Sequence, residues 1–263
     1  MDDPTRHLRL DVLGAGPAYT DRPGATGAAY LVRAGTSSVL LDLGQGSLPR
    51  LFAHLEPSTL GAVAISHLHP DHFIDLVPLR HYLRWEFQPG RRVRVIGPDG
   101  LAARLDQLHA DPEFSRAALD IEPVSVLAPT IVGALRVDAR RVTHAGHSVG
   151  YRVSQATDHT APGLVYSGDC GRATDLDALV RPGDTLLVEV SFGAGPVKPG
   201  AMHLDGPAVG SLAVRTDAAA VLLTHLQMGH DPDQTIASVR AAGYGGPVSL
   251  VEPGTSVAIP TPA

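Results

Sequence analysis

Short apolar runs alternate with amphipathic stretches along this chain of 263 residues. Residues 8–13 alternate apolar and polar positions as an edge strand does, and the apolar runs at 28–32 and 38–42 predict the next two strands. Apolar positions at helical spacing over 73–87, on both sides of a proline, predict one or two helices, and 101–108 predicts another. The pattern is that of layered α/β structure.

The second half of the chain continues the alternation. It contains no linker and no low-complexity segment, so we expect one domain over residues 1–263. Two strands are predicted at 135–143 and 163–168. From Pro182 onward the expected order is strand, helix, strand, helix, strand, over residues 185–191, 207–213, 219–225, 235–242 and 247–251.

Candidate chemistry lies directly after the apolar run at 61–66. There the chain reads His67, Leu68, His69, Pro70, Asp71, His72, which puts three imidazoles and a carboxylate on one short loop. Zinc and similar metals favour these donors, but so short a loop cannot point four of them at one ion. The sequence therefore predicts two metals, with His67 and His69 on one and Asp71 and His72 on the other.

This string at the end of a buried strand resembles the signature of the metallo-β-lactamase-fold hydrolases. The resemblance implies three more metal ligands in chain order, each at the end of a later strand. His144 would complete the first histidine set, Asp169 would bridge both metals, and His225 would be the last ligand of the second. His147 is a rival to His144, although the spacing to the following Gly-Tyr-Arg at 150–152 favours His144.

Other residues near these positions have implied supporting roles. His203, before the predicted helix at 207–213, matches a histidine that donates a proton or contacts phosphate, with helix capping as the alternative. Glu189 resembles the carboxylate that orients such a histidine, and Asp42 resembles one that supports the metal loop. Cys170 is expected to be a buried neutral thiol rather than a ligand. The implied catalytic residues are Asp71 and His203.

The resemblance implies a four-layered αββα sandwich and a hydrolase that attacks its substrate with a hydroxide bridging two divalent metals. Zinc is the first expectation for these ligands, with manganese or iron as alternatives. The aspartate at the bridging position, the histidine before Gly150 and His203 favour a phosphodiesterase of the tRNase Z-like branch. True tRNase Z enzymes insert a long tRNA-binding arm between the residues matching His144 and Asp169, where this chain has only about 24 residues.

A small or cyclic phosphodiester is thus the expected substrate. Alternatives are a carbonyl hydrolase for a lactone, thioester or β-lactam, a tRNase Z-type ribonuclease, and a di-iron redox protein without hydrolytic activity. The formal charge of −6 disfavours a nucleic-acid partner, and the arginines of 91–94 and 140–141 fit strand faces exposed to water.

Three features of the sequence bear on where in the cell the protein is expected. The start of the chain is polar, no apolar run approaches the roughly 20 residues of a membrane span, and the single cysteine excludes an internal disulfide. We therefore expect a cytoplasmic protein with no membrane partner. Relatives in the family that the chain resembles often form homodimers, and the apolar stretch at 76–87 would supply the surface of such a dimer.

Overall fold

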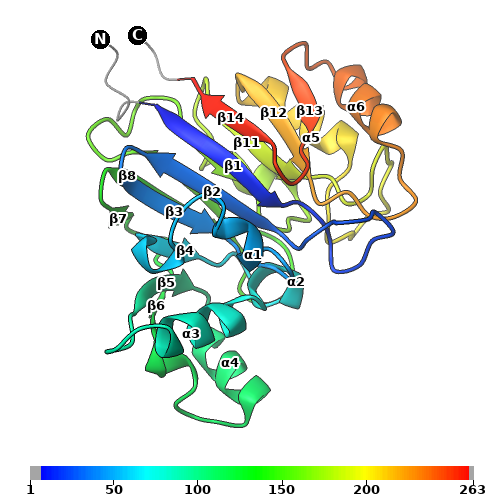
Figure 1. The fold of residues 1–263 in the computed structure, drawn as a ribbon. Helices are drawn as coiled ribbons and strands as arrows, with labels where there is room; N and C mark the ends of the chain where they lie inside the picture. The colour runs from blue at the N-terminus through cyan, green and yellow to red at the C-terminus, as the bar shows by residue number, and fades with distance from the viewer. Residues whose placement is uncertain (1–6, 261–263) are drawn as a thin grey trace.

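Two seven-stranded sheets face each other in this protein, whose computed structural model describes residues 7–260 (Figure 1). The strands of the first sheet, in spatial order, are β14 (Ser256–Ile259), β1 (Leu8–Gly14), β2 (Ala29–Ala34), β3 (Ser37–Leu41), β4 (Ala62–Ala64), β5 (Val93–Gly97) and β6 (Leu119–Pro123). Those of the second are β13 (Val248–Leu250), β12 (Ala220–Thr224), β11 (Thr185–Glu189), β10 (Leu164–Tyr166), β9 (Val149–Gln155), β8 (Leu135–Arg141) and β7 (Thr130–Val132).

Helices cover the outer face of each sheet. On the first sheet these are α1 (Leu48–Leu51), α2 (Pro70–Phe73), α3 (Leu76–Trp85) and α4 (Leu101–His109), and on the second α5 (Gly206–Arg215) and α6 (Pro232–Ala241). Short 3-10 turns lie at Pro57–Thr59, Ser115–Ala117 and Ala173–Leu176. The four layers confirm the predicted αββα sandwich.

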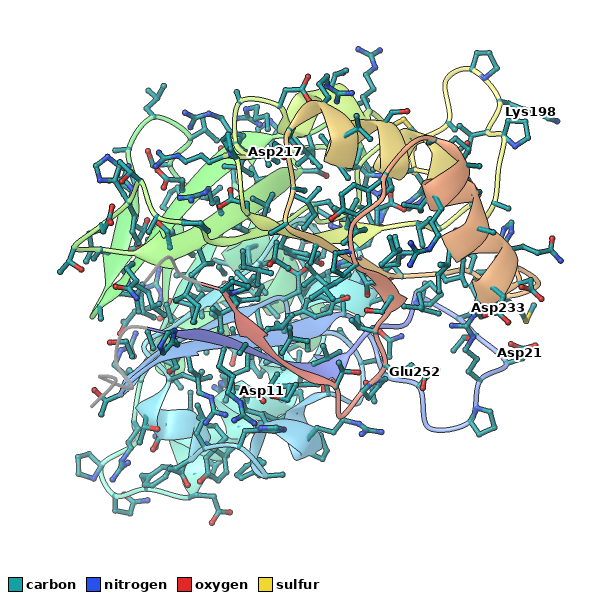
Figure 2. All side chains as sticks on the ribbon, turned by 90° about the horizontal axis from the view of Figure 1, so that it is seen from above. Asp11, Asp21, Lys198, Asp217, Asp233 and Glu252 are labelled. Carbon is teal, nitrogen blue, oxygen red and sulfur yellow. The ribbon has the colours of Figure 1, made fainter. Side chains whose placement is uncertain are left out.

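Three apolar layers hold the sandwich together. The inner layer joins the facing sheets, for example through Tyr30, Leu41 and Tyr166, and side chains fill this space (Figure 2). The outer layers pack helix residues such as Leu79 of α3 and Leu212 of α5 against their sheets. Burial of apolar surface in these layers is the main stabilising contribution.

The direction of the strands determines at which edge of each sheet the candidate site residues lie. β3 to β6 run parallel to one another, as do β10 to β13, so their carboxyl ends meet at common sheet edges. In parallel α/β sheets the loops after these ends carry ligand-binding residues. The chain segments after β4, β10, β11 and β12 contain seven of the eight residues predicted as metal ligands or catalytic groups, and the eighth, His144, follows β8.

Several expected elements differ from those observed. Residues 8–13 do form a strand, but β1 is not an edge strand because β14 pairs with it on the side opposite β2. The stretch at 73–87 contains the last residue of α2 and the whole of α3. Pro78 lies in the first turn of α3, where a backbone N–H has no partner within the helix, so its missing N–H costs no hydrogen bond. No strand was predicted at β6, β7 or β14, and β5 was foreseen only as the charged strand face at 91–94.

Two arginines of 91–94 lie on or beside a strand and pair with acidic residues, in agreement with the expected strand face. Arg94 of β5 and Glu122 of β6 form an ion pair, as do Arg92 and Asp120 beside it. Within residues 7–260, the helices are all too short or too polar to cross a membrane.

Candidate metal centre

The loop after β4 turns into α2 at Pro70, and this turn separates the two predicted ligand pairs. His69 is the N-cap of α2 with an extended backbone, whereas Asp71 and His72 lie on the helix itself. Proline at the first helical position suits this turn because its ring presets the helical φ angle. His67 and His69 consequently face one side of the site, and Asp71 and His72 face the other.

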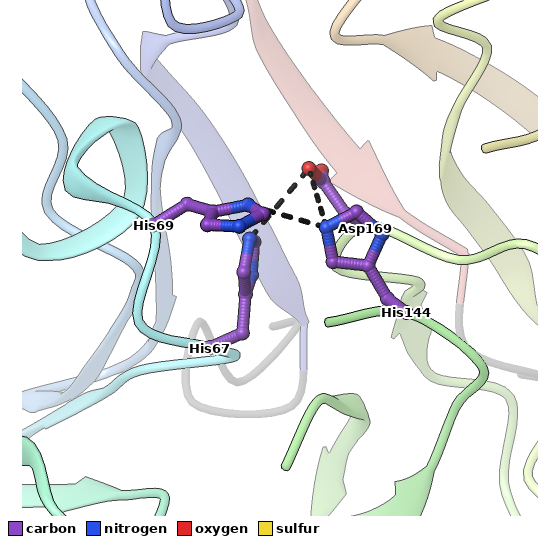
Figure 3. Close-up of side chains that lie close together, drawn as sticks. All are labelled: His67, His69, His144 and Asp169. Carbon is purple, nitrogen blue, oxygen red and sulfur yellow. Dashed lines mark hydrogen bonds and ion pairs between the residues drawn. The ribbon is translucent and has the colours of Figure 1, made fainter. Parts of the chain in front are cut away.

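One set of donors consists of His67, His69, His144 and Asp169, drawn in Figure 3. Nε2 of His67 and Nε2 of His144 each lie 3.6 Å from Oδ2 of Asp169. Nε2 of His144 is also 3.2 Å from Nδ1 of His69. The structure therefore brings together the four residues that the sequence assigned to the first metal.

A second set consists of Asp71, His72 and His225. Nε2 of His225 lies 3.2 Å from Oδ2 of Asp71 and 3.3 Å from Nε2 of His72. Oδ1 of Asp169 is 3.3 Å from Nε2 of His72 and 3.5 Å from Nε2 of His225. The two carboxylate oxygens of Asp169 thus face different donor sets, which is the arrangement of a carboxylate shared by two ions.

Hydrogen bonds behind His67 fix which of its nitrogens carries the proton. The Ser66 hydroxyl donates to Oδ2 of Asp42 at 2.7 Å, so its oxygen is left to accept from Nδ1–H of His67 at 3.1 Å. The lone pair of Nε2 then points toward Asp169. Burial lowers the pKa of His67 well below its usual value, which keeps this imidazole neutral at pH 7.

Two other histidines are oriented in the same way. Nδ1 of His72 lies 2.7 Å from Oδ2 of Asp42, and Nδ1 of His144 lies 2.8 Å from the carbonyl oxygen of Met202. Each acceptor oxygen accepts a hydrogen bond from Nδ1–H and leaves Nε2 directed at the site. Oxygen acceptors behind metal-binding histidines commonly set the tautomer and the ring orientation in this manner.

Two further observations indicate that the donor sets suit metal ions. Nε2 of His67 and Oδ1 of Asp169 are buried and have no hydrogen-bond partner among residues 7–260, and such groups are costly unless something binds them. Burial alone would lower the pKa of His72, yet the carboxylates of Asp169 and Asp42 raise it well above its usual value. The potential at this site therefore favours positive charge.

His203 lies at the rim of the second set. Its Nδ1 is 3.0 Å from Oε1 of Glu189 and 3.8 Å from Oδ2 of Asp169. Burial opposes protonation of His203, but the hydrogen bond and the charge of Glu189 raise its pKa above the usual value. Ser191 donates its hydroxyl proton to Oε2 of Glu189 and lies 3.0 Å from Nδ1 of His225, so it links the two histidines.

The structure separates other candidates from the donor sets. His147 is half exposed and its Nδ1 lies 3.6 Å from Oδ2 of Asp99, which makes it neither a ligand in either set nor a support behind one. Cys170 is buried, its thiol donates to the carbonyl oxygen of Arg172, and burial raises its pKa, as expected of a neutral thiol. Neither residue joins the seven donors.

Arg152 of the Gly-Tyr-Arg segment points away from the site. Its guanidinium is buried and forms two hydrogen bonds, at 2.7 and 2.8 Å, with the buried carboxylate of Asp184. Arg152 therefore supports the structure around the second sheet rather than the metal centre.

Three supporting residues escaped sequence reasoning: Ser66, Tyr166 and Ser191. The hydroxyl of Tyr166 donates to Oδ2 of Asp42 at 2.6 Å across the space between the sheets. Ser66 and Ser191 each lie within two residues of a predicted site residue, and that proximity was the signal available in the sequence. Tyr166 gave no signal because its contact with Asp42 depends on the docking of two sheets.

Two facing mixed sheets, outer helices and a histidine and aspartate cluster at the carboxyl ends of the strands define the class of metallo-β-lactamase-fold proteins. The model of the beta-lactamase superfamily domain matches residues 31–240, and the chain belongs to this family. An uncharacterized protein of Mycobacterium leprae is 31% identical over 261 residues, covering 97% of this chain and 90% of that protein. The probable metallo-hydrolase YhfI of Bacillus subtilis is 24% identical over 220 residues, covering 83% and 87%.

Solved structures share the fold. The crystal structure of YhfI has a TM-score of 0.84 at 21% identity, covering 96% of this chain and 99% of that one. The short form of human tRNase Z has a TM-score of 0.69 at 20% identity, covering 96% and 99%, and a diphosphatase from the PhnP family has 0.71 at 15%, covering 95% and 97%. At these identities the likeness is one of fold.

Proposed function

We propose that this chain is a two-metal phosphodiesterase for a small or cyclic phosphodiester. The observation that carries the proposal is the position of Asp169, whose two oxygens face two donor sets. His67, His69 and His144 would hold one ion, and Asp71, His72 and His225 the other, with Asp169 shared. The ions would be zinc first, since these donors suit zinc and also manganese and iron.

The chemistry supplied by two such ions is Lewis acidity, which lowers the pKa of water toward neutrality and stabilises negative charge on phosphate oxygens. The residues of the chain would orient the substrate and exclude bulk water from the site. Asp71, Asp169, His203 and His225 line one cavity of about 300 Å³, which is large enough for a phosphate group and a small substituent.

His203 is the residue placed to move a proton. Because Glu189 accepts from its Nδ1–H, its Nε2–H is the group left to protonate a departing alkoxide. The raised pKa of His203 keeps a larger fraction of the imidazole protonated near neutral pH. A departing alkoxide gains from such a proton donor whether it leaves phosphorus or a carbonyl carbon, so the preference for a phosphodiester is argued from the fold and tested by turnover.

The path between His144 and Asp169 supports a small substrate. It consists of β9, β10 and the connection at residues 156–163, with no additional subdomain. The likeness in fold to a tRNase Z and to a diphosphatase supports phosphoester chemistry, and the short connection argues against tRNA as the substrate.

Turnover of bis(p-nitrophenyl) phosphate, a chromogenic lactone and a β-lactam by protein of known metal content tests the proposal. We expect hydrolysis of the phosphodiester that stops with a chelator and returns with added metal. Turnover of the carbonyl substrates alone would reject the phosphodiesterase assignment and leave the metal centre intact. The cytoplasmic location and the homodimer stay predictions.

A further inference from the structure

A second cavity adjoins the metal centre on the side of the first donor set. Its volume is about 400 Å³, and its lining includes His67 and His69. His69 also lines the cavity that contains His203, so the metal centre lies between the two cavities. A phosphodiester has a substituent on each side of phosphorus, and two cavities on either side of the centre suit such a substrate.

Of the two charged residues that line this second cavity, one has a partner of opposite charge and the other has none. Asp99 has the imidazole of His147 at 3.6 Å, whereas the guanidinium of Arg104 forms no ion pair and no side-chain hydrogen bond with any residue from 7 to 260. Arg104 lies on α4, and its backbone N–H bonds to the carbonyl oxygen of Gly100. Arg104 is exposed at the cavity, and its guanidinium, which has no partner among residues 7–260, is available to a ligand anion.

The start of α4 adds to the positive potential. Pro98 and Asp99 line the cavity directly before this nine-residue helix, whose N-cap, Gly100, supplies no side chain to the free N–H groups of the first turn. The N-terminal end of a helix carries partial positive charge. There is also space, because a Cβ built on Gly146 in the cavity wall would meet nothing within 4 Å.

We infer that this second cavity is a substrate subsite in which Arg104 binds an anionic group, a phosphate or a carboxylate, carried by one substituent of the phosphodiester. The inference rests on the proposed function for the position of phosphorus at the metal centre. It makes Arg104 a residue that determines specificity rather than rate. The guanidinium presents a planar pair of N–H donors, which matches the oxygens of either anion.

The test compares two ligands that differ by one anion, thymidine 5′-phosphate and thymidine 3′,5′-bisphosphate, by calorimetry on the metal-loaded protein. A third ligand with a 3′-O-carboxymethyl group distinguishes carboxylate from phosphate. We expect wild-type protein to bind at least one of the two ligands that carry a 3′ anionic group about tenfold more tightly than the 5′-phosphate, as for one charge-assisted contact. Arg104→Ala should abolish this preference and Arg104→Lys should restore part of it.

Matched variants isolate the charge. Arg240→Ala removes another exposed arginine, on α6 and outside the cavity, and should keep the full preference. Asp99→Asn removes the carboxylate of the cavity and should strengthen the preference a fewfold. No preference in wild-type protein, or the same preference in Arg104→Ala, would overturn the subsite.

Hydrolysis distinguishes this inference from the proposed function. The p-nitrophenyl ester of thymidine 5′-phosphate, with and without a 3′-phosphate, reports turnover. If neither diester is hydrolysed while the Arg104-dependent binding preference persists, the phosphodiesterase proposal fails and the anion subsite stands. If both are hydrolysed at ratios that Arg104→Ala leaves unchanged, the subsite fails and the phosphodiesterase stands.

Discussion

Oε1 of Glu189 lies 3.0 Å from Nδ1 of His203, and this contact gives the histidine both its orientation and its raised pKa. The other oxygen of Glu189 accepts from the backbone N–H and the hydroxyl of Ser191. The carboxylate is therefore held on both sides, and it orients the imidazole of His203 for the proton transfer that we propose.

His203→Ala tests this role through the leaving group. The turnover number should fall about 10²–10⁴-fold for diesters with an alkoxide leaving group, which needs a proton, and far less for those that release p-nitrophenolate. Steady-state kinetics on both substrate types, with metal content measured in parallel, check the prediction. Equal losses on both would show that His203 acts on binding or structure instead.

Asp169→Ala should abolish activity and remove at least one metal equivalent, because both donor sets lose an oxygen. Cys170→Ser, at the adjacent position, should leave activity and metal content nearly unchanged, since the thiol bonds to a backbone carbonyl. Elemental analysis of the two purified variants decides the matter. Full metal content in Asp169→Ala would exclude it as the shared ligand.

Tyr166→Phe should weaken metal binding about 10–100-fold, because it removes the hydroxyl that holds Asp42 behind His72. The control is Tyr151→Phe, which removes an equally buried hydroxyl bonded to the carbonyl oxygen of Ile65. Each variant should lose about 1–2 kcal/mol of unfolding free energy. Competition with a chromogenic chelator measures affinity, and similar affinity losses in both variants would contradict the role of Tyr166.

Asp11 should make the free energy of unfolding depend on pH in the acidic range. Burial favours its neutral form, but hydrogen bonds from Ser256, Arg33 and Arg9 lower its pKa below the usual value. A lowered folded-state pKa adds stability that is fully present above the unfolded value, about 3.9, and is lost as the pH falls through the folded value. Urea unfolding should show wild type more stable than Asp11→Asn by about 1–3 kcal/mol near pH 7.

That difference should shrink only below about pH 4, where wild-type Asp11 takes up its proton. A difference that stays constant down to the acid-unfolded state would mean that the Asn side chain disturbs the packing and that the charge of Asp11 contributes nothing.

Sequence reasoning succeeded where a residue and its role lie close together in the chain. His67, Asp169 and His225 each follow an apolar run that forms a strand, so the family resemblance could be placed on them residue by residue, and their role as metal ligands stays a prediction. The starts of α5 and α6 were placed too late, although Asp205 and Asp231 cap them and proline follows within two residues of each cap.

Features that depend on contacts distant in the sequence were missed. β1 was expected at an edge because alternation describes the two faces of a strand and says nothing about its neighbours, and β14 lies more than 200 residues away. For the same reason the partner of Arg152 was not foreseen, since Asp184 reaches it only when β9, β10 and β11 have paired.

The donors come from both sheets: the loop after β4 belongs to the first, and Asp169 and His225 follow strands of the second. Under the two-metal proposal, neither half of the chain contains a complete set of ligands. Metal affinity then includes the free energy of docking the halves, so a substitution in the inner apolar layer would lower metal content without touching a ligand. The number of ions bound per chain would report the fraction of a preparation in which both halves have folded together.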